Sequence, residues 1–244
     1  MTIALRDSVA HVFVDDLAAP TLSDDDQHHL ARVLRVRDGE SVSASNGRGG
    51  WRLCQWRDGG LHGESDVHHV AAPTPRLGVA FVPVKGDRPE WAVQKLTEIG
   101  VDDIIVLAPT RRAVVRWGDD KHLRKLQVVA REAAMQSRRV WLPTIKGPVS
   151  LAEVCARPGA AVADPAGEPL DAEPLNAAAR AASAPSPATS IIIIIGPEGG
   201  FDADELTPSV RRVSLGDTIL RAETATLVAA TLLANLRNRM KGPQ

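Results

Sequence analysis

The pattern of apolar and polar residues changes character about seventy residues into the chain. Before that point, apolar and polar residues alternate over short stretches such as 40–45 and 51–56, which predicts short β-strands separated by turns. After it, unbroken apolar runs alternate with segments of helical periodicity, a pattern typical of a parallel sheet with helices on both faces. The proline-containing stretch 71–75 separates the two patterns, so we expect a β-rich domain over 1–72 and an α/β domain over 76–244.

One helix is expected within the β-rich domain. Ser23 can cap its first turn, where the acidic run 24–26 is favoured by the helix dipole. Leu30, Val33 and Leu34 recur at helical spacing, which predicts a buried apolar stripe on this helix.

The α/β domain is expected to alternate strands and helices along its length. The predicted strands are 77–84, 103–108, 160–163, 191–195 and 210–215, and the predicted helices are 89–99, 119–139 and 222–237. A further helix is expected after Asp202, which has Glu205 three residues on, in the pattern of a capping box. The stretch 168–190 is rich in alanine, proline and serine, which is typical of a surface connection.

Five consecutive isoleucines at 191–195 cannot alternate between a buried and an exposed face. They predict a strand that is buried on both faces, as in the middle of a parallel sheet. The strand ends at the loop 196–200, with the sequence Gly-Pro-Glu-Gly-Gly, and a second loop, 215–221, leads into the last helix. Open α/β sheets bind ligands at the carboxyl ends of their strands, so these two loops form the candidate ligand site.

The composition of the first loop argues against a phosphate ligand. A P-loop needs a lysine followed by serine or threonine after its glycines, and a dinucleotide fingerprint needs another glycine spacing near the start of the sheet. The loop has neither, and the acids Glu198 and Asp202 instead favour a cationic ligand without phosphate. S-adenosylmethionine, an adenosine with a sulfonium group, has these properties. The alternative is that both loops are only tight turns, with Glu198 placed by the dipole of a following helix.

The net charge of −1 conceals a basic segment. Residues 111–139 contain nine lysines and arginines but only three acidic residues. Such a one-sided segment in a nearly neutral protein suggests a polyanionic partner. The alternative is a solvated helix face that binds nothing.

Other kinds of site are poorly supported. Cys54 and Cys155 lack metal-binding spacing, so each is expected to be a small buried side chain, and the histidine pairs 28–29 and 68–69 have no companion ligands, so no metal is expected. No Ser/His/Asp or Cys/His nucleophile arrangement stands out. The sequence has no apolar run long enough to span a membrane and no signal-peptide pattern at its start, so we expect a cytoplasmic protein.

The two loops together resemble a known class of enzymes. The segments Gly196-Pro-Glu-Gly-Gly-Phe201 and Leu215-Gly-Asp-Thr-Ile-Leu-Arg-Ala-Glu-Thr-Ala225 are similar to those of SPOUT methyltransferases, which use S-adenosylmethionine to modify RNA. Further matching segments at 28–36, 95–100 and 131–138 narrow the resemblance to the 16S ribosomal RNA (uridine-N3) methyltransferase family. The resemblance covers nearly the whole chain. The Ala/Pro/Ser-rich stretch after residue 168 departs from the family's pattern.

The resemblance implies a small PUA-like, RNA-binding β-barrel followed by an α/β SPOUT domain with a deep trefoil knot, a rare exception to the rule against threaded chains. It implies S-adenosylmethionine as the cofactor, bound at the knot, and a reaction that belongs to ribosomal RNA processing and ribosome biogenesis. The expected cofactor-binding residues are Leu107, Pro109, Gly196, Pro197, Glu198, Gly199, Gly200, Leu215, Gly216, Ile219, Leu220 and Thr224.

Two residues are expected to act on the uridine. Its N3 carries a proton at neutral pH, so methylation requires loss of that proton and stabilisation of charge on the uracil oxygens. Arg221 is the expected catalytic residue, because a guanidinium stays charged and offers planar donors. Glu223 is expected to orient Arg221 or accept a proton, although the two could simply form an ion pair at the helix entry.

The expected partner is 16S rRNA, within the assembled small ribosomal subunit, and the resemblance also implies a homodimer. The expected RNA-binding residues are Arg32, Arg35, Arg48, Arg111, Arg112, Arg116, Arg131, Arg138 and Arg139. The apolar positions of the last helix suit either a subunit interface or burial within one subunit. Two other functions stay open: a SPOUT enzyme that methylates a ribose oxygen of transfer RNA, and a non-catalytic RNA-binding or ribosome-assembly factor.

Overall fold

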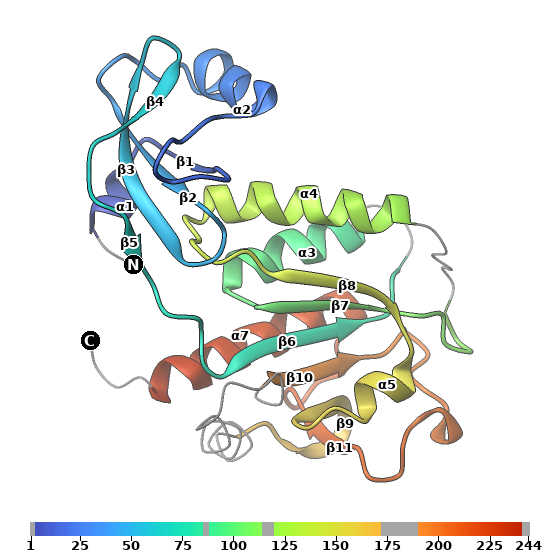
Figure 1. Ribbon diagram of the computed structural model, residues 1–244. Helices are drawn as coiled ribbons and strands as arrows, with labels where there is room; N and C mark the ends of the chain where they lie inside the picture. The colour runs from blue at the N-terminus through green and yellow to red at the C-terminus, as the bar shows by residue number, and fades with distance from the viewer. Residues whose placement is uncertain (1–2, 85–87, 114–119, 172–189, 241–244) are drawn as a thin grey trace. The chain divides into compact units, whose positions relative to one another are not determined.

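The computed structural model describes residues 3–84, 88–113, 120–171 and 190–240, and it divides the chain into two compact units (Figure 1). The N-terminal unit comprises Met1–Ala72 together with Arg131–Leu142, and the sheet unit comprises Pro73–Ala130 and Pro143–Gln244. The segment Arg131–Leu142, which the hydrophobic pattern places in the second domain, therefore packs with the first. Its residue Val140 joins Leu5 and Trp51 in a small buried cluster, a long-range contact that leaves no periodic signal in the sequence.

The N-terminal unit is built on a five-stranded sheet. Its elements are α1 (Ile3–Asp7), β1 (Ala10–Phe13), α2 (Asp24–His28), η1 (His29–Val33), β2 (Ser41–Ser45), β3 (Gly50–Arg57), β4 (Gly60–Gly63) and β5 (His68–His69). β1 pairs in parallel with β2, whereas β3 pairs antiparallel with β2, β4 and β5. The strands predicted at 40–45 and 51–56 are confirmed as β2 and β3, which pair antiparallel, and the apolar residues that alternate along them fill the core of the unit.

The predicted helix of this unit begins as expected but ends differently. The Ser23 hydroxyl accepts a hydrogen bond from the backbone of Asp26 and caps α2. After α2 the chain widens into the single π-helical turn η1, which carries Leu30 into the core. The prediction of a three-residue apolar stripe is wrong, because this turn leaves Val33 and Leu34 61% and 48% exposed.

A buried histidine stabilises the N-terminal unit. His11 is buried on β1, where its Nε2 donates to the carbonyl of Arg139 (3.0 Å) and its Nδ1 lies 2.8 Å from the Ser43 hydroxyl oxygen. The pKa of His11 is lowered to about 4, chiefly by burial; the bond to the Arg139 carbonyl opposes this shift, and the nearby charge of Arg138 contributes to it. The imidazole is therefore neutral at physiological pH.

The sheet unit contains six parallel strands in the order β11-β9-β10-β6-β7-β8 (Figure 1). Its strands are β6 (Arg76–Phe81), β7 (Asp103–Leu107), β8 (Thr144–Val149), β9 (Ala160–Pro169), β10 (Ser190–Ile195) and β11 (Arg211–Ser214). Its helices are α3 (Arg88–Ile99), α4 (Asp120–Gln136), α5 (Leu151–Cys155), η3 (Ala203–Glu205) and α7 (Ala222–Met240), of which α4 continues into the N-terminal unit from Arg131. Within the ranges given above, no helix has both the length and the hydrophobicity that a membrane span requires.

The isoleucine strand β10 lies between β6 and β9, although it follows both of them in the chain. Ile191, Ile193 and Ile195 pack on one face with residues of α3 and α7. Ile192 and Ile194 pack on the opposite face with residues of α5. All five are at most 2% exposed, so the prediction of a strand buried on both faces is confirmed. The trefoil knot that the resemblance implies stays a prediction.

Other elements of the sheet unit differ from the sequence pattern. The pattern did not identify β8 or α5, whose residues carry little apolar periodicity. The helix expected after Asp202 is a single 3₁₀ turn, η3, although the capping contact from the Asp202 amide to Glu205 is present (3.0 Å). β9 is longer than the expected 160–163, and residues 172–189 of the stretch 168–190 lie outside the described part of the chain.

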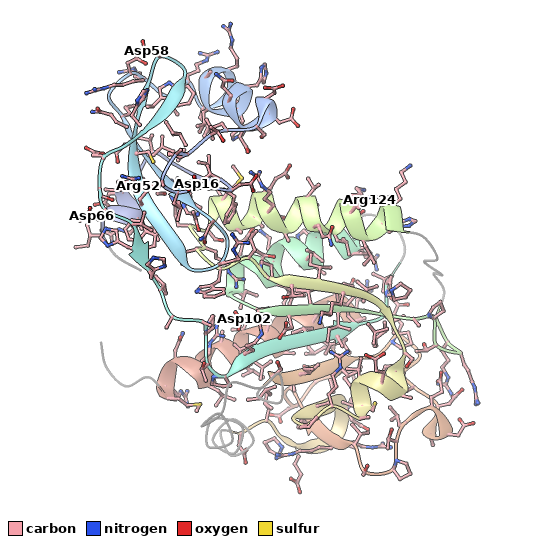
Figure 2. All side chains as sticks on the ribbon, in the orientation of Figure 1. Asp16, Arg52, Asp58, Asp66, Asp102 and Arg124 are labelled. Carbon is pink, nitrogen blue, oxygen red and sulfur yellow. The ribbon has the colours of Figure 1, made fainter. Side chains whose placement is uncertain are left out.

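A buried ion pair holds the C-terminal end of α7. The Arg237 guanidinium donates to the carboxylate of Asp102, which is labelled in Figure 2, and to the carbonyl of Gly100 (3.0 Å). Asp102 also accepts the backbone N–H of Leu77 (2.9 Å), at the amino end of β6. Because both charged residues are buried, loss of one partner would leave the other uncompensated, at a cost of about 3–5 kcal/mol.

We expect the free energy of unfolding of the N-terminal unit to fall as the pH falls from 6.5 towards 4. In this window the unfolded chain binds a proton at His11, with its ordinary pKa of 6.5, while the folded chain does not. The loss by pH 4.5 is roughly 2–3 kcal/mol, measurable by urea unfolding at pH 7 and pH 4.5.

The variant His11→Gln should lose this pH dependence, whereas His62→Gln, at an exposed position, should keep it. Equal pH dependence in the wild type and His11→Gln would contradict the assignment.

Candidate functional site

A cavity of about 410 Å³ lies at the carboxyl ends of β10 and β11, beside residues 162–165 of β9. This is the edge of a parallel sheet at which ligands bind in α/β proteins. Its volume is within the range of roughly 300–1,000 Å³ that is usual for small-molecule sites. Nine residues that the sequence proposed for the cofactor line it: Gly196, Pro197, Glu198, Gly199, Gly200, Leu215, Gly216, Ile219 and Leu220.

The first loop of this cavity is a tight turn directly after β10. The Gly200 amide donates to the carbonyl of Pro197 (2.8 Å), and Gly200 has a φ of +70°, which glycine adopts without strain. A Cβ atom at Gly196 would lie 3.1 Å from the ring of Phe201, which also lines the cavity. The loop therefore brings bare backbone to the edge of the cavity.

The second loop connects β11 to α7. The Ser214 hydroxyl donates to the carbonyl of Gly216 (3.0 Å) and shapes the start of the loop. Ile219, on the cavity wall, is 88% exposed within the chain. An apolar side chain so exposed at the rim of a cavity offers surface to a ligand or to another molecule.

Three residues proposed for the cofactor lie outside this lining. Leu107 is buried in the core on the α5 face of the sheet, and Pro109 and Thr224 are exposed. Their assignment rested on the resemblance to a family, which identifies loops but not the orientation of each side chain.

The turn that follows β7 instead holds the first loop in place. Arg111 pairs with Asp204 (2.7 Å), and its amide donates to Glu205 (2.9 Å). Arg112 pairs with Asp202 (2.5 Å) and donates to the carbonyl of Gly199. Two arginines that the sequence proposed for RNA thus connect the β7 turn to the loop after β10.

Sequence reasoning missed several residues that line the cavity, including Asp164 and Arg212, which form an ion pair (2.8 Å) on its wall. Asp164 follows the short apolar stretch 160–163, which was predicted to be a strand. In the structure it lies within β9, and its place directly after the predicted apolar stretch was the signal that could have identified it.

The two proposed catalytic residues stand at the start of α7. Arg221 is exposed, and its backbone carbonyl accepts the first helical hydrogen bond, from Ala225 (2.8 Å). Glu223 is half-buried and pairs with Arg88, the first residue of α3, at 3.2 Å. Glu223 therefore pairs with Arg88, and not with Arg221 as the helix-entry alternative proposed.

The remaining arginines proposed for RNA differ in their surroundings. Arg32, Arg35 and Arg48 are exposed in the N-terminal unit. Arg131 forms a two-pronged pair with Asp26 (2.6 and 3.0 Å), and Arg138 donates to the Ser8 carbonyl (2.8 Å).

Arg139 contributes its carbonyl to His11, and Arg116 lies outside the described residues. The basic segment is therefore less one-sided than its sequence suggests, because distant acids such as Asp26 and Asp202 fold against it. In the described ranges, no group of three or more His, Cys, Asp or Glu side chains could hold a metal ion.

Comparison with known families gives two matches. A family described as an RNA methyltransferase domain matches residues 72–234, and an RNA methyltransferase PUA domain matches residues 22–55. Ribosomal RNA small subunit methyltransferase E of Mycobacterium tuberculosis is 32% identical, over 93% of this chain and 92% of that protein. The protein of the same name from Bacillus subtilis is 27% identical, over 93% and 94%.

Solved structures agree with this comparison. A methyltransferase from Legionella pneumophila, in complex with bound cofactor SAM, is 25% identical with a TM-score of 0.75, over 93% of this chain and 97% of that one. A ribosomal RNA small subunit methyltransferase E from Neisseria gonorrhoeae shares the fold, with a TM-score of 0.71 at 23% identity over 93% and 97%.

The parallel sheet, the cavity between its two glycine-bearing loops and the PUA match together define the class, RNA methyltransferases with an N-terminal PUA domain. Within that class, the chain belongs to the ribosomal RNA small subunit methyltransferase E family. The resemblance inferred from the sequence motifs is confirmed.

Proposed function

We propose that this protein uses S-adenosylmethionine to methylate N3 of one uridine in 16S rRNA of the small ribosomal subunit. The observation that carries the proposal is the cavity at the carboxyl edge of the sheet, which is lined by the loops 196–200 and 215–221. The chain that forms this cavity belongs to the small subunit methyltransferase E family. Family membership supports the ribosomal RNA substrate, and the specificity for uridine N3 follows the sequence resemblance.

The cavity suits S-adenosylmethionine in its chemistry. Arg212 neutralises Asp164 on the cavity wall, so the carboxylate of Glu198 leaves the lining with a net negative charge, which favours a sulfonium cation over phosphate groups. Backbone groups of the two loops can hydrogen-bond an adenine edge, and Leu215, Ile219 and Leu220 offer apolar contacts. When bound, the cofactor supplies an electrophilic methyl group.

Arg221 is proposed to stabilise the charge that develops on the uracil oxygens. It stands between Leu220 and Ala222, both of which line the cavity, and its exposed side chain is free to reach a substrate at the cavity mouth. The ion pair with Arg88 supports a positioning role for Glu223 rather than one as proton acceptor.

The proposed RNA contacts come from exposed arginines of the N-terminal unit, Arg32, Arg35 and Arg48. Arginines of this kind bind phosphates and release counterions, so binding should weaken as salt rises. Arg131 and Arg138 are left out of this set, because they bind Asp26 and the Ser8 carbonyl within the protein.

The functional molecule is proposed to be a cytoplasmic homodimer that acts on the assembled small subunit. Val228, Leu232 and Leu236 of α7 are only half-buried in a single chain, which leaves apolar surface for a second copy. Light scattering of the purified protein tests the dimer.

The first test is in vitro methylation of small ribosomal subunits from a strain that lacks the gene. We expect one 3-methyluridine per 16S rRNA, mapped by mass spectrometry of nuclease fragments, with naked 16S rRNA as a poorer substrate. A 2′-O-methyl product on transfer RNA, or cofactor-free binding to subunits, would replace the proposal with another SPOUT enzyme or with an assembly factor.

The cofactor site is tested by Gly196→Val. Its Cβ would lie against Phe201 and its methyl groups would enter the cavity, so affinity for S-adenosylmethionine should fall at least ~10-fold in calorimetry. Gly60→Val serves as the control, since a Cβ there meets only ordinary contacts in the N-terminal unit. Undiminished affinity in Gly196→Val would place the cofactor elsewhere.

The variant Arg221→Ala should reduce kcat by about 10²–10³-fold, while the affinity for S-adenosylmethionine changes little. Arg239→Ala, at an exposed position near the other end of α7, is the matched control and should retain activity. Single-turnover methylation with saturating cofactor measures the effect, and wild-type rates in Arg221→Ala would remove this residue from the reaction.

A further inference from the structure

A second cavity, of about 440 Å³, lies on another side of the loop that follows β10. Pro83, Val84, Arg88 and Arg112 form one part of its wall, and residues 197–199 form the rest. The same three loop residues also line the first cavity, so ligands in the two cavities would be neighbours at this loop.

Arg88 brings an available guanidinium to this second cavity. It is the first residue of α3 and is 47% exposed. Within the described part of the chain, its one ion pair is with Glu223 Oε1 at 3.2 Å, which leaves most of its five N–H donors for a ligand.

Glu223 is suited to fix the direction of Arg88. It stands in the first turn of α7, its side chain is 18% exposed, and among the described residues its Oε2 is buried without a hydrogen-bond partner. An anion so enclosed favours a nearby cation, so the carboxylate holds Arg88 where α3 and α7 both begin.

Arg112 is already committed within the protein. Asp202 neutralises it at 2.5 Å, and the Gly199 carbonyl accepts a further hydrogen bond. A Cβ at Gly199 would lie 3.0 Å from Arg112 Cδ, so the glycine is what lets this side chain pack against the loop. Arg112 therefore contributes to the cavity wall, whereas Arg88 has N–H donors left to bind a ligand.

We infer that this second cavity receives the pyrimidine to be methylated, with Arg88 donating to a uracil carbonyl oxygen; this rests on the proposed function. Pro83, Val84 and Pro197 offer apolar surface to a planar ring. A backbone phosphate suits the cavity less well, because it carries a full negative charge on binding, which the carboxylate of Glu198 in the wall repels, whereas uracil binds as a neutral ring.

The chemistry explains why a guanidinium is needed there. The imide N–H proton of uracil leaves to water, and the negative charge left on the ring spreads over N3 and the two carbonyl oxygens. The N3 lone pair then forms a bond to the methyl carbon as the carbon–sulfur bond breaks and its electron pair stays on sulfur. A guanidinium at a carbonyl oxygen stabilises the imide anion and so lowers the pKa of N3.

The test compares the wild type with Arg88→Gln and with Arg157→Gln, a control in which an arginine paired with Glu153 on α5 is changed. We expect kcat for small-subunit methylation to fall about 10²–10³-fold in Arg88→Gln, with unchanged affinity for S-adenosylmethionine. The rise of kcat with pH should shift to higher pH, since the substrate imide is no longer acidified.

Two further arms separate a direct role from a structural one. Arg88→Lys should recover part of kcat, because it restores the charge but not the planar donors. The imide of 5-fluorouracil is more acidic than that of uracil. With small subunits that carry 5-fluorouracil, the difference in kcat between Arg88→Gln and the wild type should therefore be smaller.

The inference is overturned if Arg88→Gln keeps wild-type kcat, or if only KM for the subunit rises while the pH profile stays in place, as a phosphate contact would predict. An inactive wild type would overturn the proposed function together with this inference. An active wild type with an equally active Arg88→Gln overturns this inference alone.

Discussion

Burial of β10 on both faces is the constraint on which the sheet unit depends. Each isoleucine of 191–195 that is removed from water contributes roughly 1.5–3 kcal/mol relative to exposure, and one-sided packing would lose nearly half of them. The strand therefore requires helices on both faces and a strand on either side, β6 and β9. With β10 fixed in this way, the loop after it can only emerge at the carboxyl edge of the sheet.

Two sets of ionic contacts then turn that edge into a site. At the opposite edge, Arg237 and Asp102 hold the end of α7, while its start stands beside the cavity. At the cavity edge, Arg111 and Arg112 bind the acids of 202–205 and fix the loop after β10. The loop after β10 thus has little side-chain bulk of its own, and contacts from the turn after β7 hold it in place.

The ion-pair partners of the arginines could not be predicted from the sequence. A count of charges along 111–139 indicated a basic surface, yet Arg131 pairs with Asp26 from a segment about a hundred residues away along the chain. Charge counts treat neighbours in sequence as neighbours in space, and this fails wherever a distant acid folds against the segment. Arg88 escaped notice for a related reason, because its partner Glu223 and the residues 197–199 of its cavity lie more than a hundred positions away along the chain.

By itself, the sequence determined the class of fold, most strands and helices, the two loops of the cavity and the family. These depend on local spacing, on β-strand and helical periodicity, and on glycines at strand ends, and all of these features are local in the sequence. Only the tertiary structure decided that 131–142 packs with the N-terminal unit, that Leu107 belongs to the core rather than the cavity, and that Arg88 and Glu223 pair. Each of these depends on which distant surfaces meet when the chain is compact, and apolar periodicity carries no information about that choice of partner.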